Sequence, residues 1–140
     1  MAIDCYAKSQ TLYRTYVLLF HMINKTILHQ CHQEGFQDYE VYGAYKIFFG
    51  TLVSESRLRI VNLLRKKKMN VTELATALDM DQTAVSHDLA RLKRCGFVKT
   101  EIKGKYRYYT LNAETIQPLM SLIDQHMSQH CIHILRGERT

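Results

Sequence analysis

Between residues 71 and 96 the apolar positions recur at steps of three and four, which is the spacing of two short amphipathic helices. The first is predicted over about 72–78, with Thr72 as its N-cap. In the turn that follows, Asp81 is available to cap a second helix over about 82–95. Gly96 favours the end of that second helix, because glycine adopts a left-handed conformation at low cost.

After Gly96 the spacing of apolar residues changes from helical to alternating, which is typical of strands. One alternating run leads into Lys103-Gly104-Lys105, and a second run that ends at Leu111 leads out, so a β-hairpin with a cationic tip is expected. Two helices, a tight turn and a basic hairpin together predict a winged helix-turn-helix. In that fold the second helix fits the major groove of DNA, and the hairpin, or wing, lies along the phosphates or the minor groove.

The apolar periodicity extends to both ends of the chain. It predicts a long helix over residues 10–34, a buried helix over 41–52, a helix capped by Ser54, and a last helix from the N-cap Thr115 to about Leu135. The expected fold is mostly α with a small β-hairpin, a winged helix-turn-helix with extra N-terminal and C-terminal dimerisation helices. We divide it into an N-terminal helical extension (1–40), a DNA-binding domain (41–111), and a C-terminal dimerisation helix and tail (112–140).

The positive charge is concentrated in the predicted DNA-binding segment. Residues 54–110 carry thirteen Lys and Arg against six Asp and Glu, whereas the rest of the chain carries six against seven. Localised positive charge indicates a polyanionic partner, since released counterions drive such binding. The cations do not line one helix, which argues against a basic helix on a membrane surface. With no apolar run of membrane-spanning length, we expect a cytoplasmic protein.

Several short segments resemble the ArsR/SmtB family of bacterial and archaeal repressors. The opening LVSESRLRIV (52–61) is similar to the start of that family's domain, 71–75 to its first helix-turn-helix helix, 83–89 to its recognition helix, and 103–111 to its wing. The resemblance covers about residues 45–135, and it departs at Asp88, where many members have a histidine. It implies a winged helix-turn-helix repressor whose terminal helices pair across a two-fold axis, so that a homodimer binds a double-stranded DNA operator.

Eight residues are expected to contact DNA. The N-terminal part of the second helix should face base edges, and cations farther along it and on the wing should bind phosphates. The predicted base-facing residues are Gln82, Thr83, Ser86 and His87, and the predicted phosphate-binding residues are Arg91, Lys103, Lys105 and Arg107.

Histidines on the last helix are the candidate effector site. His126, His130 and His133 share one helical face and follow Asp124, and such side chains suit Zn²⁺ or a similar transition-metal ion. In the resembled family, one type of metal site uses Asp-x-His on this helix and ligands from the partner protomer; Asp124-Gln125-His126 matches that half, and the later spacing does not. The alternatives are a polar stripe beside the dimer seam, with no effector, and a redox switch between Cys31 and Cys131.

An enzyme is not expected. The sequence contains no nucleophile–base motif, no phosphate-binding glycine loop and no HExxH. The alternative from another class is a winged-helix protein-interaction module that does not bind DNA, and it leaves the localised positive charge unexplained.

Overall fold

The computed structural model describes residues 27–138, which divide into one compact unit ending at Lys46 and another beginning at Ile47. The first unit contains α2 (Ile27–Gln33) and the start of α3 (Asp38–Val53), which runs on into the second unit. Most of the helix predicted over residues 10–34 lies outside the described residues. Its described end agrees with the prediction, since α2 stops just before Gly35, whose φ is +88°.

Helix α3 begins three residues earlier than expected and is less buried. The backbone N–H of Gln37 donates to the Glu40 carboxylate at 2.9 Å, which fixes the start of the helix. Apolar side chains lie all around α3 and not in one stripe, so only some of them meet the core. Phe48 and Leu52 pack against it, whereas Phe49 and Val53 are exposed. The prediction of a buried helix over 41–52 is therefore wrong for much of its surface.

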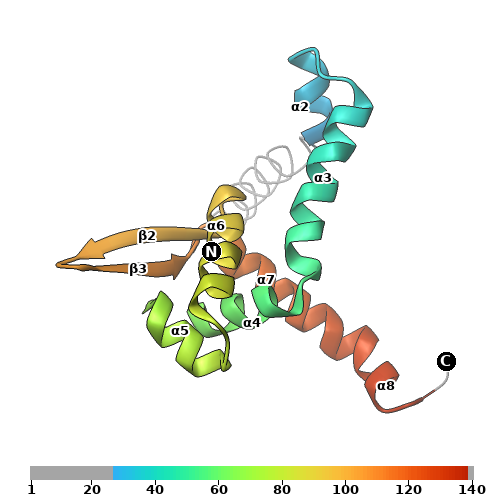
Figure 1. Ribbon diagram of the computed structural model, residues 1–140. Helices are drawn as coiled ribbons and strands as arrows, with labels where there is room; N and C mark the ends of the chain where they lie inside the picture. The colour runs from blue at the N-terminus through green and yellow to red at the C-terminus, as the bar shows by residue number, and fades with distance from the viewer. Residues whose placement is uncertain (1–26, 139–140) are drawn as a thin grey trace, which may run out of the picture. The chain divides into compact units, whose positions relative to one another are not determined.

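The second unit has a winged helix-turn-helix architecture, which confirms the predicted fold class. Helices α4 (Glu55–Leu64), α5 (Val71–Leu78) and α6 (Gln82–Arg94) surround the core, and strands β2 (Val98–Lys103) and β3 (Tyr106–Leu111) form the wing. Figure 1 shows this hairpin projecting beyond α5 and α6. A short strand, β1 (Met69–Asn70), was not predicted; it pairs antiparallel with β3 and completes a sheet of order β1-β3-β2.

Local capping explains where these helices begin. The Ser54 side chain accepts from the Arg57 N–H at the start of α4, and Asp81 accepts from the N–H groups of Thr83 and Ala84 at the start of α6, as predicted. The predicted cap Thr72 is wrong. Asn70 caps α5 in a reciprocal pair with Glu73, because pairing of β1 with β3 holds Asn70 in the extended conformation that an N-cap requires.

One apolar core joins the helices of this unit to the sheet. Its fully buried members include Ile60 of α4, Leu74 of α5 and Leu89 of α6, together with Phe97 just before β2. The helix α6 ends as predicted, with Cys95 as its C-cap and Gly96 at φ +73°. Burial of the α6 stripe against this core leaves the opposite side of the helix exposed.

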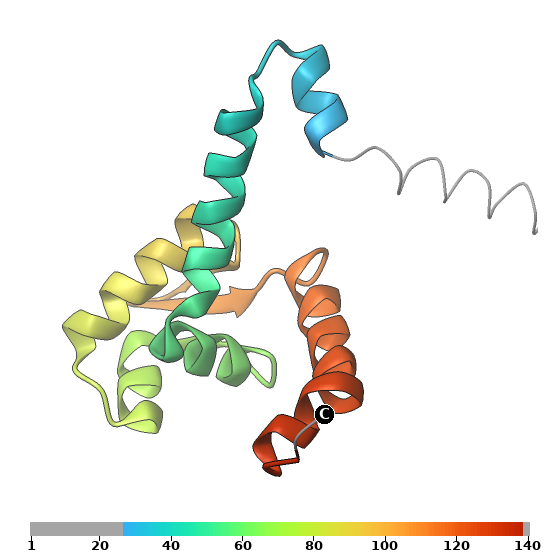
Figure 2. The ribbon, with the colours of Figure 1, turned by 90° about the vertical axis from the view of Figure 1, so that its right-hand side faces the viewer.

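The C-terminal helix is interrupted, whereas one continuous helix was expected. Helix α7 (Ile116–His126) leads into a π-helical turn, η1 (Met127–Cys131), and then into α8 (Ile132–Leu135). Thr115 precedes α7 but makes no side-chain capping bond. In Figure 2, α7 follows from β3, and the Arg65–Asp124 ion pair ties it to the end of α4. No helix among residues 27–138 is both long and apolar enough to cross a membrane.

Candidate nucleic-acid interface

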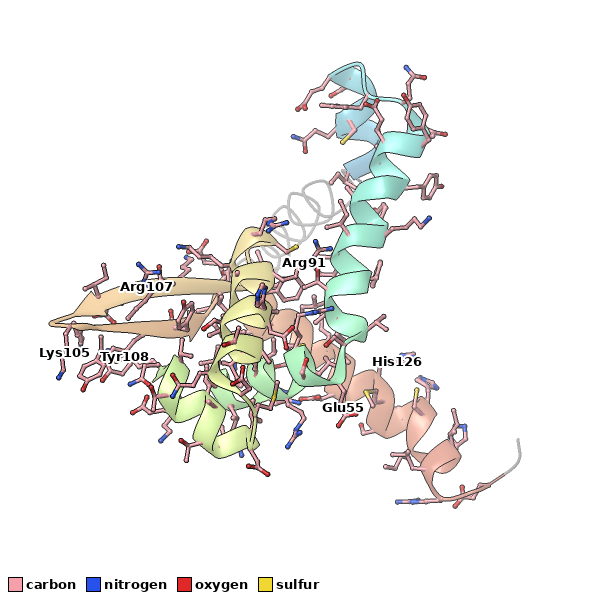
Figure 3. All side chains as sticks on the ribbon, in the orientation of Figure 1. Glu55, Arg91, Lys105, Arg107, Tyr108 and His126 are labelled. Carbon is pink, nitrogen blue, oxygen red and sulfur yellow. The ribbon has the colours of Figure 1, made fainter. Side chains whose placement is uncertain are left out.

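A groove of about 890 Å³ lies between α6 and the wing. Its α6 side includes Ser86, Ala90, Lys93 and Arg94, and its wing side includes Ile102, Lys105 and Arg107. Figure 3 shows Lys105 and Arg107 on the projecting hairpin. Four cations therefore line one open surface, which is the electrostatic arrangement that a phosphate backbone requires.

The N-terminal half of α6 exposes the predicted base-facing residues. Gln82, Thr83, Ser86 and His87 are all exposed, while Val85 on the other side of the helix is fully buried. Asp81 holds this end in place, with its carboxylate 2.8 Å from the Thr83 nitrogen and 3.1 Å from the Ala84 nitrogen. The Ala84 and Thr83 N–H bonds stabilise the carboxylate and hold the pKa of Asp81 below its ordinary value.

The three predicted cations of the wing lie in different surroundings. Arg107 is paired across the hairpin with Ile102, and both line the groove. Lys105 lies at the tip, where its Nζ is 5.2 Å from the centre of the Tyr106 ring. Lys103 lies across from Tyr106 in the sheet, with its Nζ 3.7 Å from a Glu101 carboxylate oxygen, and it is not part of the groove lining.

Glu101 partly neutralises the side of the wing that carries Lys103. Its carboxylate accepts a 3.1 Å hydrogen bond from Lys68 Nζ, and this bond holds the pKa of Glu101 below its ordinary value. Glu101 faces Tyr108 across the hairpin. Lys103 therefore has a carboxylate beside it, whereas Lys105 and Arg107, which line the groove, have no carboxylate partner among residues 27–138.

Arg91 lies on α6 but not in the groove lining. Its Nε donates to the Thr51 hydroxyl at 3.3 Å, and the residue is half-buried. Lys93 and Arg94, which were not among the predicted contacts, do line the groove. The helical period carries the signal for Lys93, since Ser86, Ala90 and Lys93 share one face at i, i+4 and i+7.

The candidate metal ligands do not form a complete site among the residues that the structure describes. Asp124 Oδ2 is 2.5 Å from a guanidinium nitrogen of Arg65, so that carboxylate already has a cationic partner. The rings of His126 and His130 lie 4.8 Å apart between centres. Across residues 27–138 no three His, Cys, Asp or Glu side chains come together as they would around a metal ion. Figure 3 shows His126 on the C-terminal helix, well away from the wing.

The two cysteines of the predicted redox switch belong to different units. Cys31 is in α2 and Cys131 ends the π-helical turn; both are half-buried free thiols. Cys131 borders an apolar cavity of about 370 Å³, together with Met127, Ile132 and Leu135.

Comparison with known proteins finds similarity to transcriptional regulators. The family model described as "bacterial regulatory protein, arsR family" matches residues 54–100. The transcriptional activator HlyU of Vibrio cholerae is 30% identical over 77 residues, which are 55% of this chain and 71% of that protein. The regulator NmtR of Mycobacterium tuberculosis is 35% identical over 88 residues, 63% of this chain and 72% of that protein.

A solved structure extends the similarity to the fold. The homodimeric winged helix-turn-helix domain of a possible ArsR-family regulator from Mycobacterium bovis is 28% identical and superposes with a TM-score of 0.63, covering 71% of this chain and 94% of that one. The relatives are named as transcriptional regulators and not as enzymes, in agreement with the expectation from sequence.

Proposed function

Because this chain belongs to the ArsR family of bacterial regulatory proteins, we propose that it represses transcription as a homodimer that binds a duplex operator at the groove between α6 and the wing. Family membership makes it a DNA-binding transcriptional regulator. Its operator-binding surface, its homodimeric assembly, its action as a repressor, its effector and its location in the cytoplasm are what we propose beyond family membership.

The observation that carries this proposal is the cationic lining of the groove on both of its sides. Lys93 and Arg94 contribute from α6, and Lys105 and Arg107 contribute from the wing. A sugar-phosphate strand held there leaves the N-terminal part of α6 directed at the major groove. We assign base contacts to Gln82, Thr83, Ser86 and His87, and phosphate contacts to Lys93, Arg94, Lys105 and Arg107. Arg91 and Lys103, which the sequence also predicted to bind phosphates, would have to leave Thr51 and Glu101 to do so.

The homodimer rests on exposed apolar side chains of the C-terminal helix. Leu122, Ile134 and Leu135 are 63%, 68% and 78% exposed in the single chain. A second copy that covers them would remove this apolar surface from water. A two-fold dimer also presents two α6 helices, as a palindromic operator requires, and the Mycobacterium bovis relative is itself described as homodimeric.

Selection from a pool of random duplexes tests the function directly. The full chain should enrich a sequence with two related half-sites about one helical turn apart. Its dissociation constant for that duplex should be at least about a thousandfold lower than for a scrambled one at the same salt concentration. Binding of both duplexes with equal affinity would contradict a specific regulator, and binding of neither would favour the protein-interaction module.

For the effector we propose a transition-metal ion held between protomers, with His126 and His130 as ligands from each C-terminal helix. The two rings are close enough to approach one ion, and a four-coordinate site would take its other ligands from the partner. Asp124 and His133 are further candidates, and Asp124 would have to leave Arg65 to bind. In support, one relative is a cadmium-resistance regulatory protein of Listeria innocua, 36% identical over 76 residues.

Calorimetric titration with Zn²⁺ tests this effector. Wild type should bind with micromolar or better affinity, and the His126→Ala, His130→Ala double variant should not. Binding should weaken in acid, because protonated imidazole cannot bind a metal. Equal weak binding by both proteins would reject the metal.

A thiol switch between Cys31 and Cys131 is the second candidate effector. In support, a solved structure of the similar protein HlyU from Vibrio cholerae is described as its reduced form. Mild oxidation should then shift the mobility of this protein on non-reducing gels, and Cys131→Ser should abolish the shift. If neither metal nor oxidation alters DNA affinity, the regulator acts without either effector.

A further inference from the structure

Asp88 is the residue at which the sequence departs from the family pattern, and its carboxylate lies inside a cluster of hydrogen bonds. Its Oδ2 accepts from the Ser56 hydroxyl at 2.5 Å, and its Oδ1 is 3.0 Å from an Arg57 terminal nitrogen. The side chain is only 14% exposed. Asp88 follows Ser86 by two residues, which is about 200° around the helix, so it projects from the side of α6 away from the groove.

Arg57 connects Asp88 to the end of another helix. Its Nε donates to the Thr51 carbonyl at 2.7 Å, and its second terminal nitrogen donates to the Gly50 carbonyl at 3.2 Å. Both carbonyls belong to the last turn of α3, where no intrahelical N–H is available to them. The planar guanidinium therefore binds α3 on one side and α6 on the other, in a geometry that a flexible lysine ammonium would not reproduce.

A second contact joins α6 to the same turn of α3. The Arg91 Nε donates to the Thr51 hydroxyl at 3.3 Å, and that hydroxyl in turn donates to the Ile47 carbonyl at 2.8 Å. Thr51 is fully buried, so this bond is shielded from water. Asp88 and Arg91 are three residues apart and share one side of α6. Two polar contacts thus fix the rotation of α6 about its own axis, which apolar packing alone fixes less sharply.

We propose that Asp88 is a positioning residue, and that the Ser56–Arg57–Asp88 cluster sets the depth and rotation of α6 in the major groove and thereby the choice of operator. This inference rests on the proposed function, since it assumes that α6 reads DNA. Charges on α6 then have two different roles. The cations on its groove side attract any duplex, and the Asp88 carboxylate on the opposite side determines which base edges the helix reaches.

The alternative role for an acid on a DNA-binding helix is to repel phosphates, and it predicts a change of opposite sign. Asp88→Asn removes the charge and keeps the shape of the side chain. If Asp88 repels phosphates, the variant binds both selected and scrambled duplexes more tightly. If Asp88 positions α6, the variant loses about tenfold in affinity for the selected duplex, the loss typical of a weakened charge-assisted hydrogen bond. Its affinity for the scrambled duplex stays the same or rises.

The matched control is Asp79→Asn. Asp79 is an exposed carboxylate in the turn just before α6, has a φ of +53° that asparagine tolerates, and makes no side-chain bond to α4. It undergoes the same charge change close to α6, so it should leave the ratio of the two affinities unchanged. Ser56→Ala should lower that ratio in the same direction as Asp88→Asn, and the double variant should lose less than the sum of the two, because both changes break one cluster.

The measurement is fluorescence anisotropy with selected and scrambled duplexes, together with circular dichroism to establish that each variant is folded. An unchanged affinity ratio in Asp88→Asn, or additive effects of Ser56→Ala and Asp88→Asn, would overturn the positioning role. Failure of the proposed function is distinguishable, because it would appear in the wild type as an absence of any preference between the duplexes; the positioning role would then fall with it.

Discussion

Replacing Val85 by Ala tests how strongly the core holds the helix that we assign to the operator. Val85 is fully buried on α6. The change removes the equivalent of two buried CH₂ groups, each of which contributes about 0.8 kcal/mol of hydrophobic stabilisation. The cavity left behind adds to this cost, and the higher helix propensity of alanine offsets about 0.5 kcal/mol of it. We expect the free energy of unfolding to fall by about 1.5 kcal/mol.

Thermal unfolding followed by circular dichroism measures this loss. For the unit that begins at Ile47, it corresponds to a drop in Tm of roughly 6–12 °C. The matched control is Val53→Ala at the end of α3, where the side chain is 81% exposed. The same chemical change there should alter the free energy of unfolding by less than about 0.5 kcal/mol. Equal shifts in the two variants would refute the assignment of Val85 to the core.

Two further predictions concern pH and assembly. Because the folded-state pKa of Asp81 is lowered, the stability from its cap is present above the ordinary carboxyl pKa and is lost as the pH falls through the folded value. Between about pH 5 and pH 2 the Tm of wild type should fall more than that of Asp81→Ser, which keeps a cap that does not titrate in this range; parallel curves would contradict this. Leu122→Glu should shift sedimentation at micromolar concentration from dimer to monomer, and an unchanged dimer would place the interface elsewhere.

The sequence was sufficient to predict the parts of the fold that local signals determine. Asp81 and Gly96 delimit α6 because an N-cap and a left-handed glycine act within one helical turn. The strand β1 was missed because two residues show no periodicity, and its partners Tyr108 and Tyr109 are distant in the chain. The same pairing explains why the N-cap of α5 is Asn70 and not the predicted Thr72.

The sequence predicted which residues of the candidate site are exposed, but not which of them contact other parts of the protein. Helical and strand periods identify which residues are exposed, but they do not reveal contacts across the fold. The pairing of Asp88 with Arg57 and of Asp124 with Arg65 joins residues 31 and 59 positions apart. The strand period places Glu101 and Lys103 on one face of β2, and the helical period places Lys93 beside Ser86, so these two positions could have been found from the sequence.

The salt dependence of binding to a random duplex tests the central claim that the groove between α6 and the wing holds the DNA backbone. Lys105→Ala removes one cation from the groove lining, and Lys99→Ala removes one from the base of the wing, where Glu114 already pairs with it at 2.9 Å. A plot of log affinity against log salt concentration should flatten by about one unit for Lys105→Ala and change little for Lys99→Ala. A slope unchanged by Lys105→Ala, or flattened equally by both variants, would contradict the account.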